Sequence, residues 1–216
     1  MKILLVAATK AEIQPTLDWL PGIDAGTQTL ITGIGMVPAT FHLTRHLTGK
    51  SSYHLVIQAG ICGAYDRSLE LGEVVQVTRD RFLAQGAEER DGSWLSLTDI
   101  GFPPADPFDA KGWLEGDLPP GFTLPYRAVI GGTIDRSSGA TSTIDRIVAR
   151  YPEVQIESME GAAVHYVCRQ YGIPVLQLRS ISNYVEPRDR SKWQIGPAIR
   201  HLNEALREVL QAAAKL

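Results

Sequence analysis

Short, uninterrupted apolar runs alternate along the chain with longer segments in which apolar residues recur every three or four positions. The short runs are typical of strands buried on both faces, and the longer segments are typical of helices that bury one face. This alternation predicts an α/β layered domain. Strands are expected at residues 3–7, 29–32, 54–58, 74–78, 127–130, 154–157 and 175–182. Helices are expected at 9–20, 37–49, 140–150, 160–171 and 192–214, the last interrupted or restarted by Pro197.

The regular pattern fades between residues 85 and 125, where prolines accumulate and Trp94 and Trp113 look exposed. We expect short strands and loops there. A long irregular segment inside an otherwise regular domain often serves as a lid or an interface. Because 216 residues suffice for one sizeable core, no boundary is placed in this segment and residues 1–216 are treated as one domain.

The bulk composition excludes several functions. The net charge is −3, so no basic field indicates binding to nucleic acid or to an anionic membrane. The apolar N-terminal run is too short for a signal peptide, and no run approaches membrane-spanning length. The two cysteines, Cys62 and Cys168, lie in apolar or glycine-rich surroundings, which favours a reducing, cytoplasmic location over a disulfide framework.

An acid and an amide fall at the ends of two consecutive predicted strands. Glu160 opens a helix of small residues after the first of these strands, and Asn183 follows the second. In an α/β sheet both positions lie at the carboxyl edge, where ligands bind. A carboxylate there can hold a vicinal diol and an amide can pair with a purine edge, which indicates a nucleoside site. The simpler explanations are that Glu160 stabilises the helix macrodipole and that Asn183 caps a loop.

Glu12 and a glycine-bearing loop are further candidates. Thr9 and Glu12 form a capping box, so Glu12 either caps the helix only or also acts as a general base. The loop Gly60-Ile61-Cys62-Gly63 follows a buried strand, and its glycines either admit a ligand close to the backbone or form a plain turn. Cys62 is expected to be a small buried residue, because no adjacent base can activate it as a nucleophile.

Two other motifs are expected to be structural. Gly33-Ile34-Gly35 begins like a dinucleotide-binding fingerprint, but Pro38 replaces the third glycine, so a strand-to-helix turn is expected. His42 and His46 stand four residues apart on a predicted helix, which suits a metal pair, but no third ligand is evident. We therefore expect no metal and no redox cofactor.

Taken together, these pieces resemble the nucleoside phosphorylase superfamily, in its hydrolase branch of methylthioadenosine/adenosylhomocysteine nucleosidases. The resemblance spans most of the chain but not residues 85–125, and beyond Glu12 it is carried in order by Gly33-Ile34-Gly35-Met36-Val37, Gly60-Ile61-Cys62-Gly63, Leu71-Gly72-Glu73-Val74-Val75, Ser158-Met159-Glu160 and Ser182-Asn183. It implies a single three-layer αβα domain with a central mixed sheet, a small-molecule nucleoside substrate and a homo-oligomer.

The resemblance also implies roles for individual residues. Glu12 matches the acid that activates the hydrolytic water, and Met159 and Glu160 match the residues that hold the ribose. The glycine loop from Gly60 to Gly63 matches a part of the substrate site, and Trp193 falls where the family has an aromatic residue near the 5′ substituent.

Two positions depart from the nucleosidases: Ser158 stands where they have an acid, and Asn183 stands where they have the aspartate that recognises the base. Adenine offers an N–H donor that suits a carboxylate. Hypoxanthine offers O6, to which the amide of Asn183 can donate while its carbonyl accepts from a protonated N7. A misplaced donor or acceptor in a buried site costs about 1–3 kcal/mol, so the choice of base should follow residue 183.

The futalosine hydrolases of menaquinone biosynthesis are N-glycosidases of this kind that take a 6-oxopurine. The chain resembles them, and the run of residues 183–193 adds to the resemblance. Their substrate carries a benzoate on its 5′ side, where a cation is expected, and the candidates are Arg136, Arg188, Arg190 and Lys192. The predicted activity is hydrolysis of futalosine to hypoxanthine and the dehypoxanthinyl product.

Three alternatives stay open. A purine nucleoside phosphorylase needs cations and glycine-loop hydroxyls to bind phosphate, but the first-turn region has no arginine, and Glu12 would repel that anion. An adenine-type nucleosidase is disfavoured by Asn183. A non-catalytic nucleoside-binding protein is disfavoured by the joint presence of Glu12, Glu160 and Asn183.

Overall fold

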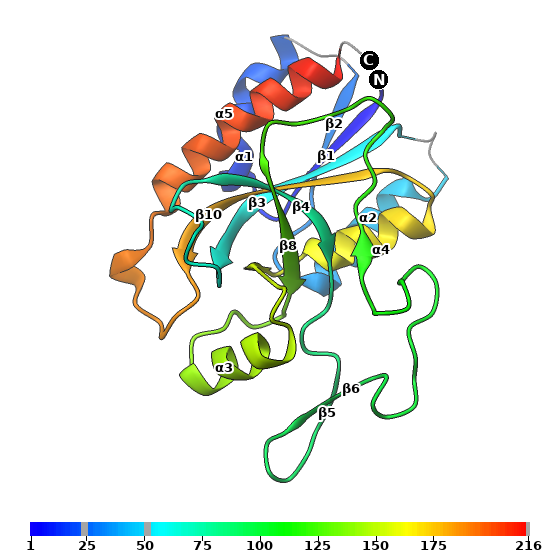
Figure 1. Cartoon of the computed structure of the whole chain (residues 1–216). Coiled ribbons are helices and arrows are strands. Elements are labelled where there is room, and N and C mark those ends of the chain that lie inside the picture. Colours follow the sequence, from blue (N-terminus) through cyan, green and yellow to red (C-terminus); the bar gives the residue numbers. More distant parts are fainter. Residues whose placement is uncertain (23–25, 50–52, 215–216) are drawn as a thin grey trace.

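The computed structural model describes residues 1–22, 26–49 and 53–214. In these residues eight strands form one mixed sheet with helices on both faces (Figure 1). The strands of this sheet are β1 (Ile3–Ala7), β2 (Thr27–Ile31), β3 (Leu55–Ala64), β4 (Val74–Asp80), β7 (Leu114–Glu115), β8 (Arg127–Thr133), β9 (Ile156–Ser158) and β10 (Val175–Tyr184). The helices are α1 (Lys10–Trp19), α2 (Met36–Leu47), α3 (Thr141–Arg150), α4 (Gly161–Gln170) and α5 (Ile195–Ala213), with 3-10 turns η1 (Leu20–Gly22) and η2 (Arg190–Lys192).

The side chains of β1 divide the core into two layers. Ile3 and Leu5 pack in one cluster with residues of α1 and α5, whereas Leu4 and Val6 pack in another with residues of α2 and α4. Successive side chains of a strand point to opposite faces, so an uninterrupted apolar strand requires cover on both sides. The predicted three-layer αβα arrangement with a mixed central sheet is therefore confirmed.

Part of the sheet closes on itself. Strand β3 pairs with β10, β10 with β4, β4 with β8, β8 with β9, and β9 again with β3. The pairs β3–β10, β4–β8 and β8–β9 are parallel, and the other two are antiparallel. This ring brings β9 and β10 to opposite sides of the last residues of β3, and that is where the cavity described below opens.

Two expectations about the elements are wrong. The expected loop 59–64 is the second half of β3. It is a strand because β10 pairs with it in parallel as far as Ala64 and so satisfies its backbone hydrogen bonds. The last helix does not begin at residue 192. It begins at Ile195, with Pro197 in its first turn, where no N–H is needed, which is close to the alternative that Pro197 restarts the helix. Residues 190–192 form the separate turn η2.

Trp113 anchors the irregular segment in a cluster formed mainly by residues outside it. Trp113 is only 1% exposed, which corrects the expectation that it is exposed. It packs with Leu83, Ile134 and Ile147, and the guanidinium groups of Arg79 and Arg81 lie 4.5 and 4.7 Å from its ring centre. Cation–π contacts with these two arginines and the apolar cluster together explain why the indole is buried.

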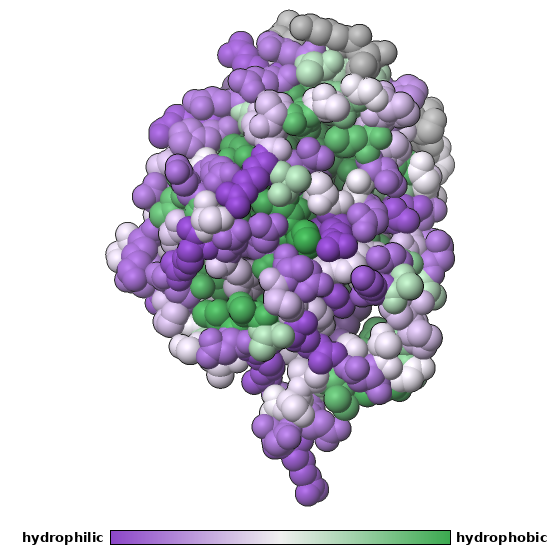
Figure 2. Space-filling model, in the orientation of Figure 1, coloured by the Kyte–Doolittle hydropathy of each residue, from purple (hydrophilic) through white to green (hydrophobic). Residues whose placement is uncertain are grey.

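Short strands and loops make up most of residues 85–125, as expected. The hairpin of β5 (Gly86–Glu88) and β6 (Trp94–Ser96) projects from the body of the molecule in Figure 1. Figure 2 shows that its tip is hydrophilic and that hydrophobic residues form small, separate patches on this face. None of the helices among the described residues is both long and apolar enough to cross a bilayer.

Candidate active site

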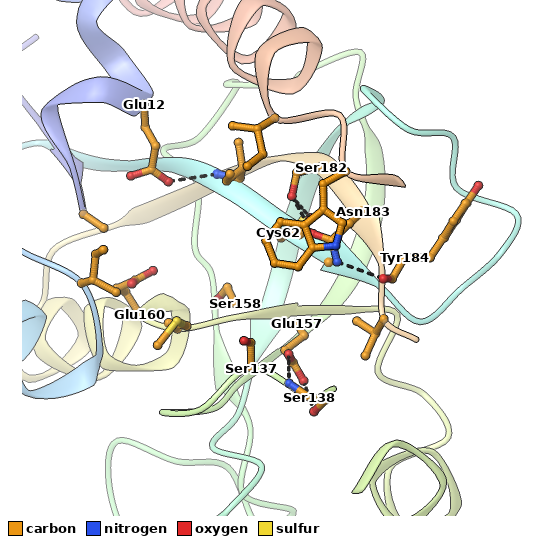
Figure 3. Close-up of a pocket in the computed structure, with 18 of the residues that line it drawn as sticks. Glu12, Cys62, Ser137, Ser138, Glu157, Ser158, Glu160, Ser182, Asn183 and Tyr184 are labelled. Carbon is orange, nitrogen blue, oxygen red and sulfur yellow. Dashed lines mark hydrogen bonds between the residues drawn. The ribbon is translucent and has the colours of Figure 1, made fainter. Parts of the chain in front are cut away.

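A cavity of about 420 Å³ opens where β3 and β10 end and where α1 and α4 begin. It collects side chains from segments that are far apart in the sequence, as the close-up in Figure 3 shows. Nine of the ten predicted site residues line it, namely Glu12, Ile61, Cys62, Gly63, Ser158, Met159, Glu160, Asn183 and Trp193. Gly60 lies behind this wall: a Cβ there would be 2.4 Å from Arg179 Nη1 and 3.0 Å from Glu12 Oε1.

Glu12 both caps α1 and reaches the cavity. Its Oε2 accepts hydrogen bonds from the Thr9 backbone N–H (2.9 Å) and hydroxyl (2.8 Å), and its own N–H donates to the Thr9 hydroxyl (3.3 Å). Its other oxygen, Oε1, accepts from the N–H of Ile61 (3.2 Å). The capping box predicted from the sequence thus fixes the carboxylate in the wall of the cavity, and the two interpretations of Glu12 are compatible.

Glu160 is the N-cap residue of α4 and is 6% exposed. Its Oε1 accepts from the N–H of Gly35 (2.9 Å), and its Oε2 lies 3.7 Å from Arg179 Nη2. Burial raises the pKa of Glu160, an effect that Arg179 and the Gly35 N–H oppose and that the nearby charge of Glu12 reinforces. The glycine turn 33–35, expected to be structural, therefore also supplies a donor to this carboxylate.

Asn183 lies on β10 just past an irregularity in its pairing with β3. Its Oδ1 accepts from the Ser182 hydroxyl (2.8 Å), and its Nδ2 donates to the carbonyl of Tyr184 (2.9 Å). An amide has two N–H donors and two acceptor lone pairs. One of each is therefore available to a molecule in the cavity.

Arg179 was not singled out from the sequence. It is almost completely buried and lies beside Glu160. It is 1% exposed, and its Nη1 donates to the carbonyl of Ile61 (3.4 Å). The sequence does carry a signal for it, because an arginine inside an apolar strand that is buried on both faces must meet an anion there.

Glu157 is a second residue that the sequence reasoning missed. It lines the cavity next to Ser158 and is 5% exposed. It accepts from the Ser138 N–H (2.8 Å), the Ser138 hydroxyl (2.5 Å) and the Tyr65 hydroxyl (2.5 Å). Its position beside the Ser-Met-Glu motif was the available signal.

Cys62 lies in the cavity wall but is 4% exposed, and burial raises the pKa of its thiol to about 12. At neutral pH the thiol is therefore protonated, which fits the expectation of a small packing residue.

The four candidate cations for the 5′ substituent differ in position. Arg188 lines the cavity, and its guanidinium lies 4.9 Å from the ring centre of Trp193, which also lines it. Arg190 lies 6.0 Å from the same ring, and Lys192 pairs with Glu186 at 3.0 Å. Arg136 is exposed and does not line the cavity.

His42 and His46 do not belong to a cluster of metal-ligand type. No group of three or more His, Cys, Asp or Glu side chains able to hold a metal ion occurs in residues 1–22, 26–49 and 53–214. The ring of His46 instead bonds through Nε2 to the Tyr53 hydroxyl at 2.7 Å.

Similarity to known proteins defines the class to which this protein belongs. The sequence profile of the phosphorylase superfamily matches residues 25–216, so the chain belongs to the phosphorylase superfamily. This confirms the superfamily that the motifs predicted. The methylthioadenosine/S-adenosylhomocysteine nucleosidase of Neisseria meningitidis, solved in complex with methylthio-immucillin-A, has the same fold, with a TM-score of 0.80, 17% identity and coverage of 98% of this chain and 100% of that one.

Within the superfamily, the chain is similar to futalosine hydrolases. It is 35% identical to the futalosine hydrolase of Streptomyces coelicolor over 163 residues, which cover 71% of this chain and 64% of that relative. It is 28% identical to the futalosine hydrolase of Thermus thermophilus over 187 residues, which cover 84% of this chain and 80% of that relative. The similarity predicted from Asn183 and the run that follows it is therefore found.

Proposed function

We propose that this protein is a purine nucleoside N-glycosidase that hydrolyses futalosine to hypoxanthine and the dehypoxanthinyl product, a reaction of menaquinone biosynthesis. The observation that carries the proposal is the presence of Asn183 in the same cavity as Glu12 and Glu160. An amide pairs with a keto purine, a buried carboxylate pairs with a diol, and a second carboxylate serves a water. The similarity to two futalosine hydrolases supports the same conclusion.

In the proposed reaction the C1′–N9 bond breaks and its electron pair moves onto the purine, which takes a proton on N7 from solvent. Asn183 stabilises that leaving base, with its amide on O6 and its carbonyl on N7–H. Glu160 holds the 2′ and 3′ hydroxyls. Glu12 orients a water and takes its proton as the oxygen adds to C1′, then returns the proton to solvent. Positioning and electrostatics supply most of the rate enhancement.

Arg179 reduces the electrostatic repulsion between the carboxylates of Glu12 and Glu160. Two carboxylates share the cavity, and Glu160 is nearly inaccessible to water. The guanidinium 3.7 Å from Glu160 offsets that negative charge, and its contact with the Ile61 carbonyl fixes the strand that donates to Glu12. An oxocarbenium-like centre forming between the carboxylates meets a net negative field.

Arg188 is the best placed of the four candidate cations for the benzoate, since it lies in the cavity wall against Trp193. A homo-oligomer and a cytoplasmic location complete the proposal. Both cysteines are buried and unpaired, which supports a reducing compartment.

The experiment is to incubate the purified protein with futalosine, inosine and methylthioadenosine, each with and without phosphate, and to follow free base by chromatography. We expect hypoxanthine from futalosine, less from inosine, little adenine, and no dependence on phosphate. Phosphate-dependent release would instead make the protein a phosphorylase. Tight binding without release would make it a nucleoside-binding protein.

A further inference from the structure

We propose that Glu157 is a specificity-determining residue of the base subsite, where it accepts the N1–H of a 6-oxopurine across from Asn183. This inference rests on the proposed function, because it assumes that a purine lies between the two side chains.

The sheet places Asn183 and Glu157 in one row. Gly63 of β3 is paired with Asn183 of β10 on one side and with Glu157 of β9 on the other. Paired residues on neighbouring strands direct their side chains to the same face, and strands lie about 4.8 Å apart, so the outer two Cα atoms are roughly 10 Å apart. An amide and a carboxylate therefore flank a position that has no side chain.

Position 63 between them has room for glycine only. A Cβ at this position would meet Val185 Cγ2 at 2.9 Å and Asn183 Nδ2 at 3.2 Å. All three residues of the row line the cavity. In the view of Figure 3, Glu12 and Glu160 lie on one side of the cavity, and Asn183 and Glu157 lie on the other. The row suits a flat ring whose sugar extends toward Glu12 and Glu160.

Glu157 is held ready as an acceptor. All three of its hydrogen bonds come from neutral donors, those of Ser138 and Tyr65, and it forms no ion pair with a described residue. Burial and the neighbouring Glu157 raise the pKa of Tyr65 well above its usual range, so the phenol remains a donor. Since a carboxylate offers about four lone-pair sites, one is free for a further N–H.

The chemistry of the purine edge fits this acceptor. In a 6-oxopurine O6 accepts and the adjacent N1–H donates, so a base with O6 toward Asn183 needs an acceptor next to it. In adenine N1 is itself an acceptor and would face the lone pairs of Glu157. The other carboxylates of the cavity have separate tasks: Glu12 and Glu160 lie on the sugar side, and Glu186 pairs with Arg67 and Lys192.

The test measures discrimination at N1. Wild-type protein and Glu157→Met, which has a side chain of similar length without an oxygen acceptor, are assayed for kcat/KM with inosine and 1-methylinosine, whose methyl group removes the donor. We expect the wild type to favour inosine by about 10- to 100-fold and Glu157→Met to favour it by less than about threefold. A steric penalty of the methyl group affects both proteins equally, so the ratio of the two preferences isolates the hydrogen bond. An unchanged preference in the variant overturns the proposal.

The matched control is Ser138→Ala, which removes one donor to Glu157 but keeps the carboxylate. It should lower kcat/KM for both substrates while retaining the preference for inosine. If Glu157 only anchors the Ser138 backbone, both variants lower all activities in parallel and the proposal fails.

Binding of the free bases to the wild type gives a measurement that depends neither on folding of a variant nor on turnover. Calorimetry should show hypoxanthine binding at least about tenfold more tightly than 1-methylhypoxanthine. Equal affinities overturn the role of Glu157. If the protein binds hypoxanthine selectively but releases no base from any nucleoside, the role of Glu157 in the base subsite stands and only the proposed hydrolysis is overturned.

Discussion

Three carboxylates of the cavity are held by two kinds of partner. Neutral N–H and hydroxyl donors hold Glu12 and Glu157, whereas a buried guanidinium and one backbone N–H hold Glu160. A buried cation ties Glu160 in place, which suits the proposed holding of hydroxyls, whereas Glu12 accepts only from neutral donors in the cavity wall and is the carboxylate proposed to orient the water. The division of roles thus follows from the partners and not from the residue type.

Replacing Glu12 with Gln separates these roles. Glutamine keeps one acceptor oxygen but cannot take a proton, so we expect kcat for futalosine to fall by about 10²–10⁴-fold with little change in binding of hypoxanthine. Steady-state kinetics and calorimetry check this. The control is Thr9→Ala, which removes the side-chain cap at a cost of about 1 kcal/mol in stability but keeps the acid, and which should retain most of the activity. Equal activity of Glu12→Gln and wild type would contradict the general-base role.

Asn183→Asp tests the recognition of O6 and N7. A carboxylate repels O6 but accepts from the exocyclic N–H of adenine. Activity on futalosine and inosine should fall by about 10- to 100-fold, and activity on methylthioadenosine should rise. The measurement is the ratio of kcat/KM values for the two kinds of base. A ratio that stays at the wild-type value shows that residue 183 does not select the base.

The sequence was sufficient to find cavity residues whose position is encoded locally. Glu12 stands out through its capping box, and Glu160 through its place at a helix start. Arg179 and Glu157 escaped because their role depends on which strands are neighbours: Arg179 is informative only beside Glu160, and Glu157 only across Gly63 from Asn183. No periodicity in the chain encodes that pairing.

At the scale of the element, the buried side chain of Asp80 fixes the start of α4 through a hydrogen-bonded threonine. Asp80 of β4 accepts from the Thr133 hydroxyl (2.9 Å), and the same hydroxyl accepts from the N–H of Ala162 (2.7 Å). This connection ties the first turn of α4 to two strands, and Glu160 caps that turn. Gly161 completes the contact, because no side chain separates the helix start from Asp80.

Gly161→Ala should therefore disturb the site and the fold together. The new Cβ would lie 2.1 Å from Asp80 Oδ2 and 2.6 Å from Gln177 Nε2, both of them buried atoms without room to retreat. We expect the free energy of unfolding in urea to fall by about 1–3 kcal/mol and activity to fall with it as Glu160 shifts.

Gly196→Ala is the matched control, since Gly196 also lies at a helix start but its Cβ would meet nothing within 4 Å. It should leave activity intact and raise stability by up to about 1 kcal/mol. Equal effects of the two substitutions would show that the contact with Asp80 is unimportant.

The existence and order of the elements followed from the apolar pattern, while several boundaries did not. The pattern placed β3 and β10 correctly but stopped both short, because the glycines and polar residues near Gly63 and Asn183 look like loop. Pairing between the two strands overrides that local preference. The extra residues are the ones that line the cavity, so the boundary error and the functional site have the same origin.

At the scale of the whole molecule, polar groups are fully buried where α4 packs against the sheet. Asp80 and His165 are both fully buried, and the Oδ2 and Nε2 atoms respectively have no hydrogen-bond partner among the described residues. Burial raises the pKa of Asp80 to about 6 and lowers the pKa of His165 to about 4. The two groups therefore affect the pH dependence of folding with opposite sign.

Below its folded-state pKa, Asp80 retains a proton that the unfolded chain releases above pH 4, so its contribution to stability is lost as pH rises from about 4 to 6. His165 stays neutral in the folded state while the unfolded chain takes up a proton below pH 6.5, so its contribution is lost as pH falls from 6.5 to about 4. Each shift of about two pKa units corresponds to about 3 kcal/mol. Over this interval the two contributions nearly cancel in the wild type.

Two substitutions should each expose one contribution. Asp80→Asn removes the contribution of the acid and leaves that of His165. As pH rises from 4 to 6.5, the unfolding free energy of this variant should therefore increase by about 3 kcal/mol more than that of the wild type. In His165→Gln the acid remains, and the unfolding free energy should decrease over the same interval. Urea denaturation at half-unit steps of pH measures both slopes, and differences from the wild type remove the titration of surface groups. Variants whose curves run parallel to the wild-type curve would show that neither group has the shifted pKa, and that solvent reaches both side chains.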